Sequence, residues 1–399
     1  MKDSIPASPV TDFTRAIAPV TPQVFFDEYF EKRHLVIRRE DRDYYRDLLS
    51  LADIDQVLTS VMLSTEEVQM VNTGQPVPVA DYAQASGWID PARVAQQFEA
   101  GATIILPALH RMLPRLTAYC RALETVFSCD LQTNIYFTPA EAQGFKTHYD
   151  SHDVIVLQCH GSKLWRIYDS PLELPLRSQA FKPEGFTPGA VIDEFVLNAG
   201  DLLYCPRGVV HDARATDEMS LHITTGLLTP RWVDLVVEAV SQLALTDPAL
   251  RRAVPPGFAN DGFDRTQARQ TFRDLLTRAA QAMDPDAVLD GFAAEFRDRR
   301  VPVLPGQFLQ HVASDGVAVG TRVALRPHLI SAIARQDDTV VLSVYGTDIS
   351  FPAHAEGALR AALKGPGFVV GELDCDLDED GQAVLARRLV REGVLYQPV

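Results

Sequence analysis

The stretch "FKTHYDSHDVIVLQCHGSKLWRIYD", residues Phe145–Asp169, decides the fold prediction. It places His148 and Asp150 two residues apart, directly before an apolar run typical of a buried β-strand. Residues i and i+2 of a strand point to the same face, so we expect both side chains at the mouth of such a strand. A carboxylate buried there needs a positive partner. A metal ion would satisfy it, provided that a third ligand follows.

The third ligand is predicted in "NAGDLLYCPRGVVHDA", residues 198–213. Here a strand beginning at Gly200 is followed by a Pro206–Gly208 turn and then by His211, in the spacing G-x5-P-x-G-x2-H. Two histidines and one carboxylate on facing strands suit non-heme Fe(II) and leave positions open for other ligands. A structural zinc site would be closed, usually by cysteines. We therefore predict a metal site and no catalytic residue beyond its three ligands.

His222 lies on the next predicted strand, "SLHITTGL". Ligating groups generally need orienting partners, so His222 could orient the site or contact the substrate. The alternative is an ordinary core histidine.

Composition limits the classes of protein that remain. The 399 residues exceed one ordinary core, so two or three domains are expected. The formal net charge of −16 disfavours nucleic-acid binding and favours cationic partners. The five cysteines are scattered without a CxxC pair, which indicates a reducing cytoplasm. No secretory signal is visible, and no apolar run approaches the ~20 residues that span a membrane.

The pattern of apolar residues changes twice along the chain. Helices and short strands come first, followed from "LQTNIYFTP" to "SLHITTGLL" by short strands with Gly and Pro turns, which predict a barrel or sandwich. Three amphipathic helices follow Pro230. The Pro-rich "VPVLPGQF" marks a boundary, after which strands and helices alternate in a small α+β module.

The combination of "NIYFTP", "QGFKTHYD", "VLQCHGSKLWRIYD", "GDLLYCPRGVVH" and "SLHITTGL" resembles the JmjC-type ribosomal oxygenases. That family uses Fe(II) and 2-oxoglutarate to hydroxylate side chains of ribosomal proteins. The resemblance implies an α+β fold: N-terminal helices and a double-stranded β-helix (cupin/JmjC) barrel, a helical dimerisation region, and a C-terminal winged-helix-like domain. It places these domains at residues 1–232, 233–303 and 304–399.

The resemblance also implies roles for single residues. His148, Asp150 and His211 would hold the iron, and Lys163 would bind the distal carboxylate of 2-oxoglutarate. A dicarboxylate needs one cation at its far end once a metal holds the near end, and Lys163 shares a strand face with Trp165. Asn134 falls near the co-substrate.

Tyr136, two positions after Asn134 on the same strand, falls near the substrate side chain in the family. The alternative is that Tyr136 is ordinary barrel core.

Two features depart from a single family pattern. Many cupins carry an Asn four residues after the third ligand, where this chain has Ala215. Lys163 resembles family members that hydroxylate histidine, whereas "TTGLLTPRW" resembles bacterial members that hydroxylate arginine. The sequence leaves both targets open.

Two other functions remain as alternatives. A cupin oxygenase acting on a small molecule or a biosynthetic peptide would need the metal but little of the C-terminal third. A non-enzymatic winged-helix regulator would need a basic contact face. Residues 301–399 hold eight Lys or Arg and twelve Asp or Glu, giving 8 − 12 = −4, so that function is disfavoured.

The sequence also predicts the oligomeric state of the protein and the charge of its substrate. Two apolar stripes, Val233/Val236/Val240/Leu243 and Phe272/Leu275/Leu276/Ala279, predict a two-fold homodimer through the helical region. An acidic protein attracts basic polypeptides, so we expect a ribosomal protein or a similarly basic substrate.

Overall fold

The computed structural model describes residues 12–398, which fold as two compact units. The first unit ends at Thr229, and the second spans Pro230–Pro398. The three-domain boundaries expected from the sequence stay a prediction, because the described chain divides only once. No helix in the described part is long and apolar enough to cross a membrane.

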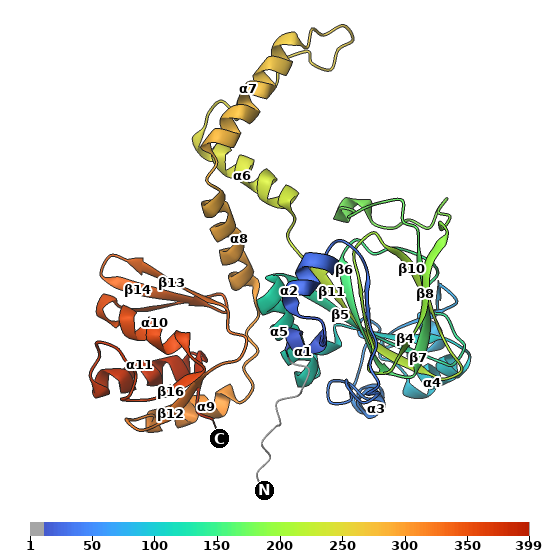
Figure 1. Cartoon of the computed structure of the whole chain (residues 1–399), viewed down its shortest axis with the longest axis horizontal. Helices are drawn as coiled ribbons and strands as arrows, with labels where there is room; N and C mark the ends of the chain where they lie inside the picture. The colour runs from blue at the N-terminus through green and yellow to red at the C-terminus, as the bar shows by residue number, and fades with distance from the viewer. Residues whose placement is uncertain (1–11, 399) are drawn as a thin grey trace. The chain divides into compact units, whose positions relative to one another are not determined.

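The first unit combines short N-terminal helices with a strand-rich body (Figure 1). Its helices are α1 (Phe13–Ala16), α2 (Pro22–Val24), the π-helix η1 (Phe25–Tyr29), α3 (Leu51–Ser60), α4 (Pro91–Glu99) and α5 (Pro114–Phe127), with short 3₁₀ turns at Val79–Asp81, Leu109–Arg111 and Arg177–Gln179. Its strands are β1 (Leu35–Ile37), β2 (Gln69–Asn72), β3 (Gln75–Pro76), β4 (Thr103–Pro107), β5 (Asp130–Thr138), β6 (Asp153–His160), β7 (Ser162–Tyr168), β8 (Val191–Asn198), β9 (Leu202–Cys205), β10 (Val210–Ala215) and β11 (Ser220–Leu228).

These strands form two facing antiparallel sheets. The large sheet has the order β1-β9-β6-β11-β5-β4-β2-β3, and the small sheet has the order β10-β7-β8. From β6 to β11 the chain passes between the sheets: β6, β9 and β11 belong to the large sheet, and β7, β8 and β10 to the small one. This is the double-stranded β-helix expected from the sequence, and its Greek-key-like alternation closes the barrel.

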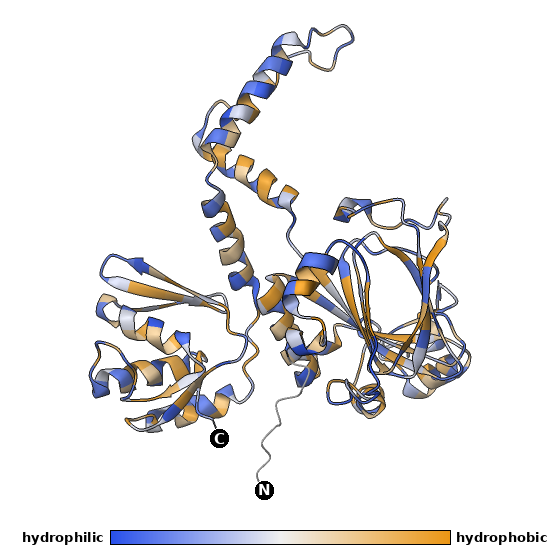
Figure 2. Ribbon diagram, in the orientation of Figure 1, coloured by the Kyte–Doolittle hydropathy of each residue, from blue (hydrophilic) through white to orange (hydrophobic). Residues whose placement is uncertain are grey.

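The large sheet is covered on both faces, which explains the apolar run in β6. Val154 and Val156 face the small sheet and pack with Trp165 and Phe195, whereas Ile155 and Leu157 pack in the core shared with the N-terminal helices. A strand buried on both sides reads as continuously hydrophobic. In Figure 2 the hydrophobic colour accordingly runs along the barrel strands.

The β6–β7 hairpin requires glycine at its turn. Gly161 has φ +63°, and a Cβ there would lie 1.9 Å from the backbone oxygen of Met219. Only glycine permits both this conformation and this approach. The turn sets the register that brings β7 over the interior of the barrel.

The second unit contains a helical segment and a small α+β body (Figure 1). Its helices are α6 (Trp232–Thr246), α7 (Thr266–Ala282), α8 (Pro285–Arg299), α9 (Gln307–Ala313), α10 (Glu356–Lys364) and α11 (Glu379–Arg391), with 3₁₀ turns at Ser314–Gly316 and Ala353–Ala355. Its strands are β12 (Arg322–Leu325), β13 (Ser331–Gln336), β14 (Thr339–Val344), β15 (Thr347–Pro352), β16 (Gly367–Val369) and β17 (Leu395–Tyr396).

The three helices expected after Pro230 are present as α6, α7 and α8. The C-terminal body has two three-stranded sheets, β16-β12-β17 and β13-β14-β15, around one core that includes Leu342, Leu359 and Leu389. Its description as winged-helix-like stays a prediction.

Candidate metal centre and its cavity

His148 and Asp150 lie where the chain crosses from the small sheet to the large one. His148 forms an isolated antiparallel bridge with His211 of β10, and β6 begins only at Asp153. His148 and Asp150 therefore lie directly before the apolar strand, as the sequence places them. Their side chains point toward one another, as their i and i+2 spacing predicted.

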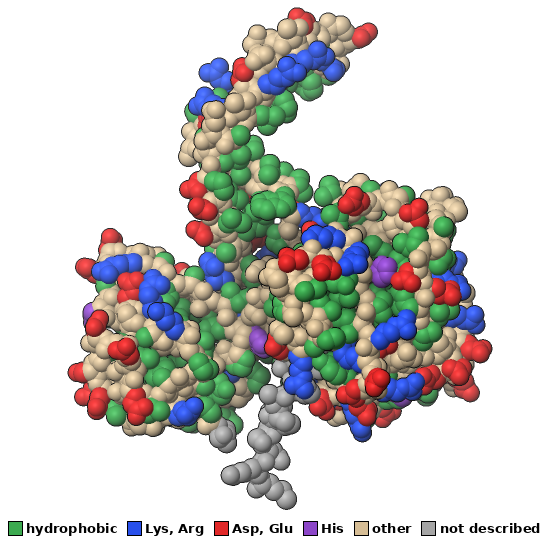
Figure 3. Space-filling model, viewed as in Figure 1, with side chains coloured by type: hydrophobic (Ala, Val, Ile, Leu, Met, Phe, Trp, Pro, Cys, Tyr) green, Lys and Arg blue, Asp and Glu red, His purple; other side chains and the backbone are tan. Residues whose placement is uncertain are grey.

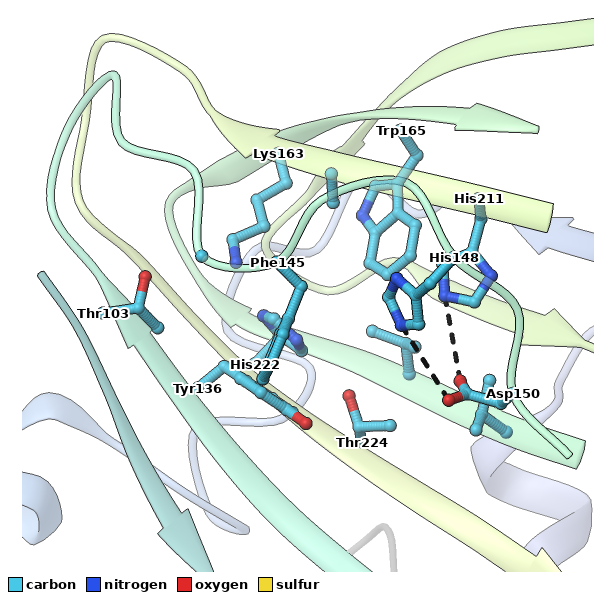
Figure 4. Close-up of a pocket in the computed structure, with 14 residues that line it drawn as sticks. Thr103, Tyr136, Phe145, His148, Asp150, Lys163, Trp165, His211, His222 and Thr224 are labelled. Carbon is cyan, nitrogen blue, oxygen red and sulfur yellow. Dashed lines mark ion pairs between the residues drawn. The ribbon is translucent and has the colours of Figure 1, made fainter. Parts of the chain in front are cut away.

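Three ligand side chains converge at this crossing (Figure 4). Asp150 Oδ1 lies 3.8 Å from His148 Nε2, and Asp150 Oδ2 lies 3.8 Å from His211 Nε2. One ligand atom of each residue falls within 4.8 Å of the others, and no other described residues form such a cluster. The predicted triad is thus brought together.

Both imidazoles are oriented by their other ring nitrogen. His148 Nδ1 is 2.8 Å from the carbonyl oxygen of Lys146, and His211 Nδ1 is 3.0 Å from that of Val209. If each Nδ1 carries the proton, each Nε2 presents its lone pair toward Asp150. This tautomer is the one a metal requires.

Electrostatics favour the same state at His211. Burial, followed by the nearby His148, lowers the pKa of His211 below its usual value, although Asp150 acts in the opposite direction. A neutral imidazole can ligate, whereas an imidazolium cannot. Two neutral nitrogens and one carboxylate therefore fit Fe(II), and open positions remain for other ligands.

A cavity of ≈ 270 Å³ extends from the triad into the barrel. It is lined by residues of both sheets and of the segment before His148: Thr103, Tyr136, Gly144, Phe145, His148, Asp150, Val154, Val156, Lys163, Trp165, His211, Ala213, His222 and Thr224. Figure 4 shows Lys163 and the triad on opposite sides of the Phe145 ring.

Lys163 is buried and has no carboxylate partner among residues 12–398. Its side chain is only 4% exposed, and its Nζ donates to Thr138 Oγ1 at 3.0 Å. Burial lowers the pKa of Lys163 to about 7. A buried ammonium that finds only a hydroxyl is costly, and an anionic ligand in the cavity would relieve that cost. The residue thus fits the distal carboxylate of 2-oxoglutarate.

Two further polar atoms on the cavity wall lack partners. Trp165 Nε1 and His222 Nδ1 are buried and make no hydrogen bond within the described residues. Buried polar groups are normally satisfied. A polar ligand in the cavity would supply such partners, which supports the same co-substrate.

Of the remaining predicted residues, Tyr136 and His222 lie on the wall of the cavity. The His222 ring stacks on Tyr136 with centroids 4.9 Å apart and an interplanar angle of 13°. Burial, followed by Lys163, lowers the pKa of His222 well below its usual value. Burial and then Asp150 raise the pKa of Tyr136 to about 12, while the neighbouring Asn134 amide opposes them. Asn134 does not line the cavity, and its predicted role stays untested.

The sequence analysis missed Thr103 and Thr224, which line the cavity, and Thr138, the hydrogen-bond partner of Lys163. Thr138 shares the inward face of β5 with Asn134 and Tyr136, and Thr224 shares that of β11 with His222; period-2 alternation could have identified both. Thr103, by contrast, reaches the site through the pairing of β4 with β5, and its Oγ1 lies 3.2 Å from Thr138 Oγ1. No signal local to β4 indicates this.

Comparisons with known proteins agree with this architecture. Residues 108–235 match the JmjC domain family. Ribosomal oxygenase 1 of Rattus norvegicus is 31% identical over 96% of this chain and 72% of its own length. The Dictyostelium discoideum protein named bifunctional lysine-specific demethylase and histidyl-hydroxylase NO66 is 34% identical over 57% of this chain and 45% of its own length.

Among solved structures, the Escherichia coli ribosomal oxygenase YcfD has a TM-score of 0.53 and 16% identity, covering 95% of this chain and 98% of its own. At that identity the similarity concerns the fold. Another YcfD structure is described as a complex with cobalt and 2-oxoglutarate.

The barrel and its triad define a JmjC oxygenase, the class of enzymes that depend on Fe(II) and 2-oxoglutarate. The extent of the match to ribosomal oxygenase 1 shows that the chain belongs to the ribosomal oxygenase family.

Removal of the anionic ligand tests the triad. We expect Asp150→Ala to weaken Co(II) binding by more than about 100-fold, beyond the ~10–100-fold range typical of outer partners, because the carboxylate offsets the charge of the metal. Calorimetric titration of the metal-free protein measures the change. Asp193→Ala is the control, since Asp193 pairs with His34 outside the cavity. Wild-type affinity in Asp150→Ala would refute the metal site.

Proposed function

We propose that this protein hydroxylates a side chain of a ribosomal protein or of a similarly basic polypeptide, with Fe(II) held by His148, Asp150 and His211. One observation carries the proposal: the same cavity has a metal triad at one end and the unpaired, buried Lys163 at the other. Iron and 2-oxoglutarate, when bound, supply the activation of dioxygen that puts one oxygen atom into a C–H bond and yields succinate and carbon dioxide.

The chain's own residues provide binding and exclusion. Lys163, positioned by Thr138, takes the distal carboxylate of 2-oxoglutarate, and Trp165 and His222 offer polar atoms along the cavity. Val154, Val156 and Ala213 make part of the lining apolar. An apolar wall keeps water away from the co-substrate and strengthens the contact of its carboxylate with Lys163.

The cavity favours histidine over arginine as the target. Among its lining residues the only carboxylate is Asp150, which is needed for the metal, and the only Lys or Arg is Lys163. A guanidinium is always charged and needs an anionic partner, whereas a neutral imidazole can stack on the aromatic rings of Phe145 or Tyr136. The name histidyl-hydroxylase of the Dictyostelium relative supports the same choice.

The protein is also proposed to act as a homodimer through α6, α7 and α8. Trp232, Val236, Val237 and Leu245 of α6 are exposed by 81%, 54%, 59% and 77%, and Phe272 of α7 by 63%. Of the predicted stripes, Ala279 is already buried within the unit, whereas Val233 and Leu276 are exposed. A helix that is apolar on most of its surface is normally buried. Figure 3 shows hydrophobic atoms along these helices.

The compartment proposed is the cytoplasm. All five cysteines are free thiols, four of them buried. This state suits a reducing environment.

The affinity for 2-oxoglutarate should depend on pH through Lys163. Its ammonium form is needed to bind the dicarboxylate, and in the empty cavity its pKa is lowered to about 7. Affinity should therefore level off below about pH 6 and fall as the pH rises through 7, by about 15-fold between pH 7 and pH 8.5. Titration of the Co(II) protein with 2-oxoglutarate measures this dependence.

Two variants isolate the role of Lys163. Lys163→Arg should lose the pH dependence, because a guanidinium stays charged. Lys163→Ala should bind 2-oxoglutarate roughly 30- to 1,000-fold more weakly, corresponding to on the order of 2–4 kcal/mol, while it still binds the metal. A Lys163→Ala protein with unchanged 2-oxoglutarate affinity would remove this residue from the proposal.

Mass spectrometry of the substrate tests the reaction itself. Incubation of ribosomal proteins with enzyme, Fe(II) and 2-oxoglutarate should add one oxygen to a histidine-containing peptide, and Asp150→Ala should add none. Addition to arginine would contradict the argument from the cavity. Oxidation of only a free small molecule would replace the polypeptide substrate altogether.

Oligomeric state tests the helical interface. The wild-type protein should be a dimer in light scattering, and Val236→Glu together with Val237→Glu should give a monomer, because two charges would enter an apolar contact. Val312→Glu on α9, also an exposed valine (68%), is the control and should stay dimeric. A wild-type monomer at all concentrations would exclude the proposed interface.

A further inference from the structure

A buried charged network lies beside the metal triad. Arg207 is 7% exposed and Asp153 is fully buried. Arg207 Nη1 donates to Asp153 Oδ2 at 2.9 Å and also pairs with the carboxylate of Glu31. The hydroxyl of Tyr204 donates to the other oxygen, Asp153 Oδ1, at 2.7 Å and accepts from the backbone nitrogen of Glu31 at 2.8 Å. Both carboxylate oxygens of Asp153 are therefore fixed.

This network joins the two segments that carry the ligands. Asp153 begins β6 three residues after Asp150, and Arg207 lies in the turn four residues before His211. Between them the backbone nitrogen of Gly208 donates to the carbonyl oxygen of Asp150 at 2.9 Å. The ion pair therefore ties the segment of Asp150 to the segment of His211 within a few residues of each.

Stability alone is a weak reason to bury such charges. Removing an arginine and a carboxylate from water is expensive, and a packed hydrophobic pair in the same place is often at least as stable. An ion pair also fixes the relative position of its two partners, because both must keep a defined distance and direction. Here that position affects the adjacent metal triad.

We propose that Arg207, through its ion pair with Asp153, is a positioning residue that holds Asp150 and His211 at metal-binding distance before the metal arrives. Without this ion pair the two segments separate, and part of the free energy of metal binding is then used to bring them together. The inference rests on the proposed function in one respect: the metal must bind at the triad.

A partly buried arginine provides the control. Arg39 donates to the Tyr45 hydroxyl at 2.8 Å and to the carbonyl oxygens of Gly200, Ala16 and Ala18 at 2.8, 2.8 and 2.7 Å. It ties the N-terminal segment to the turn before β9 and contacts neither ligand segment. Arg39→Gln should lower the melting temperature and leave metal affinity unchanged.

The experiment titrates Co(II) into the full-length, metal-free protein and records binding heat and the visible absorption of the bound ion. Arg207→Gln should bind Co(II) about 10- to 100-fold more weakly, the range typical of partners that orient ligands, with an altered absorption spectrum. Arg207→Lys should recover part of the affinity, because one ammonium can still pair with Asp153. Tyr204→Phe, which keeps the ion pair and removes the two hydrogen bonds of the hydroxyl, should show a smaller loss.

Each outcome decides the question. If Arg207→Gln lowers the melting temperature as Arg39→Gln does but keeps wild-type affinity and spectrum, the positioning role is wrong. If Arg207→Gln does not fold, Arg207→Lys and Tyr204→Phe decide instead, and wild-type affinity in both overturns the proposal. If His211→Ala binds Co(II) as tightly as wild type, the metal site of the proposed function fails, whatever the Arg207 variants show.

Discussion

Two backbone hydrogen bonds between His148 and His211 are the constraint on which the site depends. The nitrogen of each donates to the carbonyl oxygen of the other, at 3.0 and 2.8 Å. They are made at the point where one segment leaves the small sheet for the large sheet and the other enters β10. Because a bridge places two side chains side by side, it brings the imidazoles together, with ring centroids 4.7 Å apart. Asp150 then needs only the following turn to complete the triad.

The interior of the barrel shows how function opposes stability. Lys163, His222 and Trp165 all bring polar atoms into a space that would be more stable if filled with hydrocarbon. The surrounding barrel compensates, since the large sheet is packed on one face by the N-terminal helices and on the other by the small sheet. These three polar groups line the cavity, where a charged co-substrate can satisfy them.

Part of the fold and of the candidate site was predictable, because it depends on residues that are close together in the sequence. The spacing of His148, Asp150 and His211, the turn at Pro206–Gly208 and the alternation that aligns Lys163 with Trp165 are local patterns with direct geometric consequences. Thr103 and Arg207 were not identified, because each reaches its partner, Thr138 or Asp153, only across strands that are distant in sequence.

The sequence by itself determined a strand-rich barrel or sandwich and the spacing of the three expected ligands, because these follow from short-range periodicity and residue chemistry, whereas the double-stranded β-helix and the role of Lys163 were implied by the family resemblance. The tertiary structure alone decided that the Nδ1 atoms of His148 and His211 face backbone carbonyls and that Asp150 is the only carboxylate among the described residues that line the cavity. It also decided that a buried ion pair connects the two ligand segments. These properties arise from close packing between elements far apart in the chain, and such contacts leave no periodic signal in the sequence.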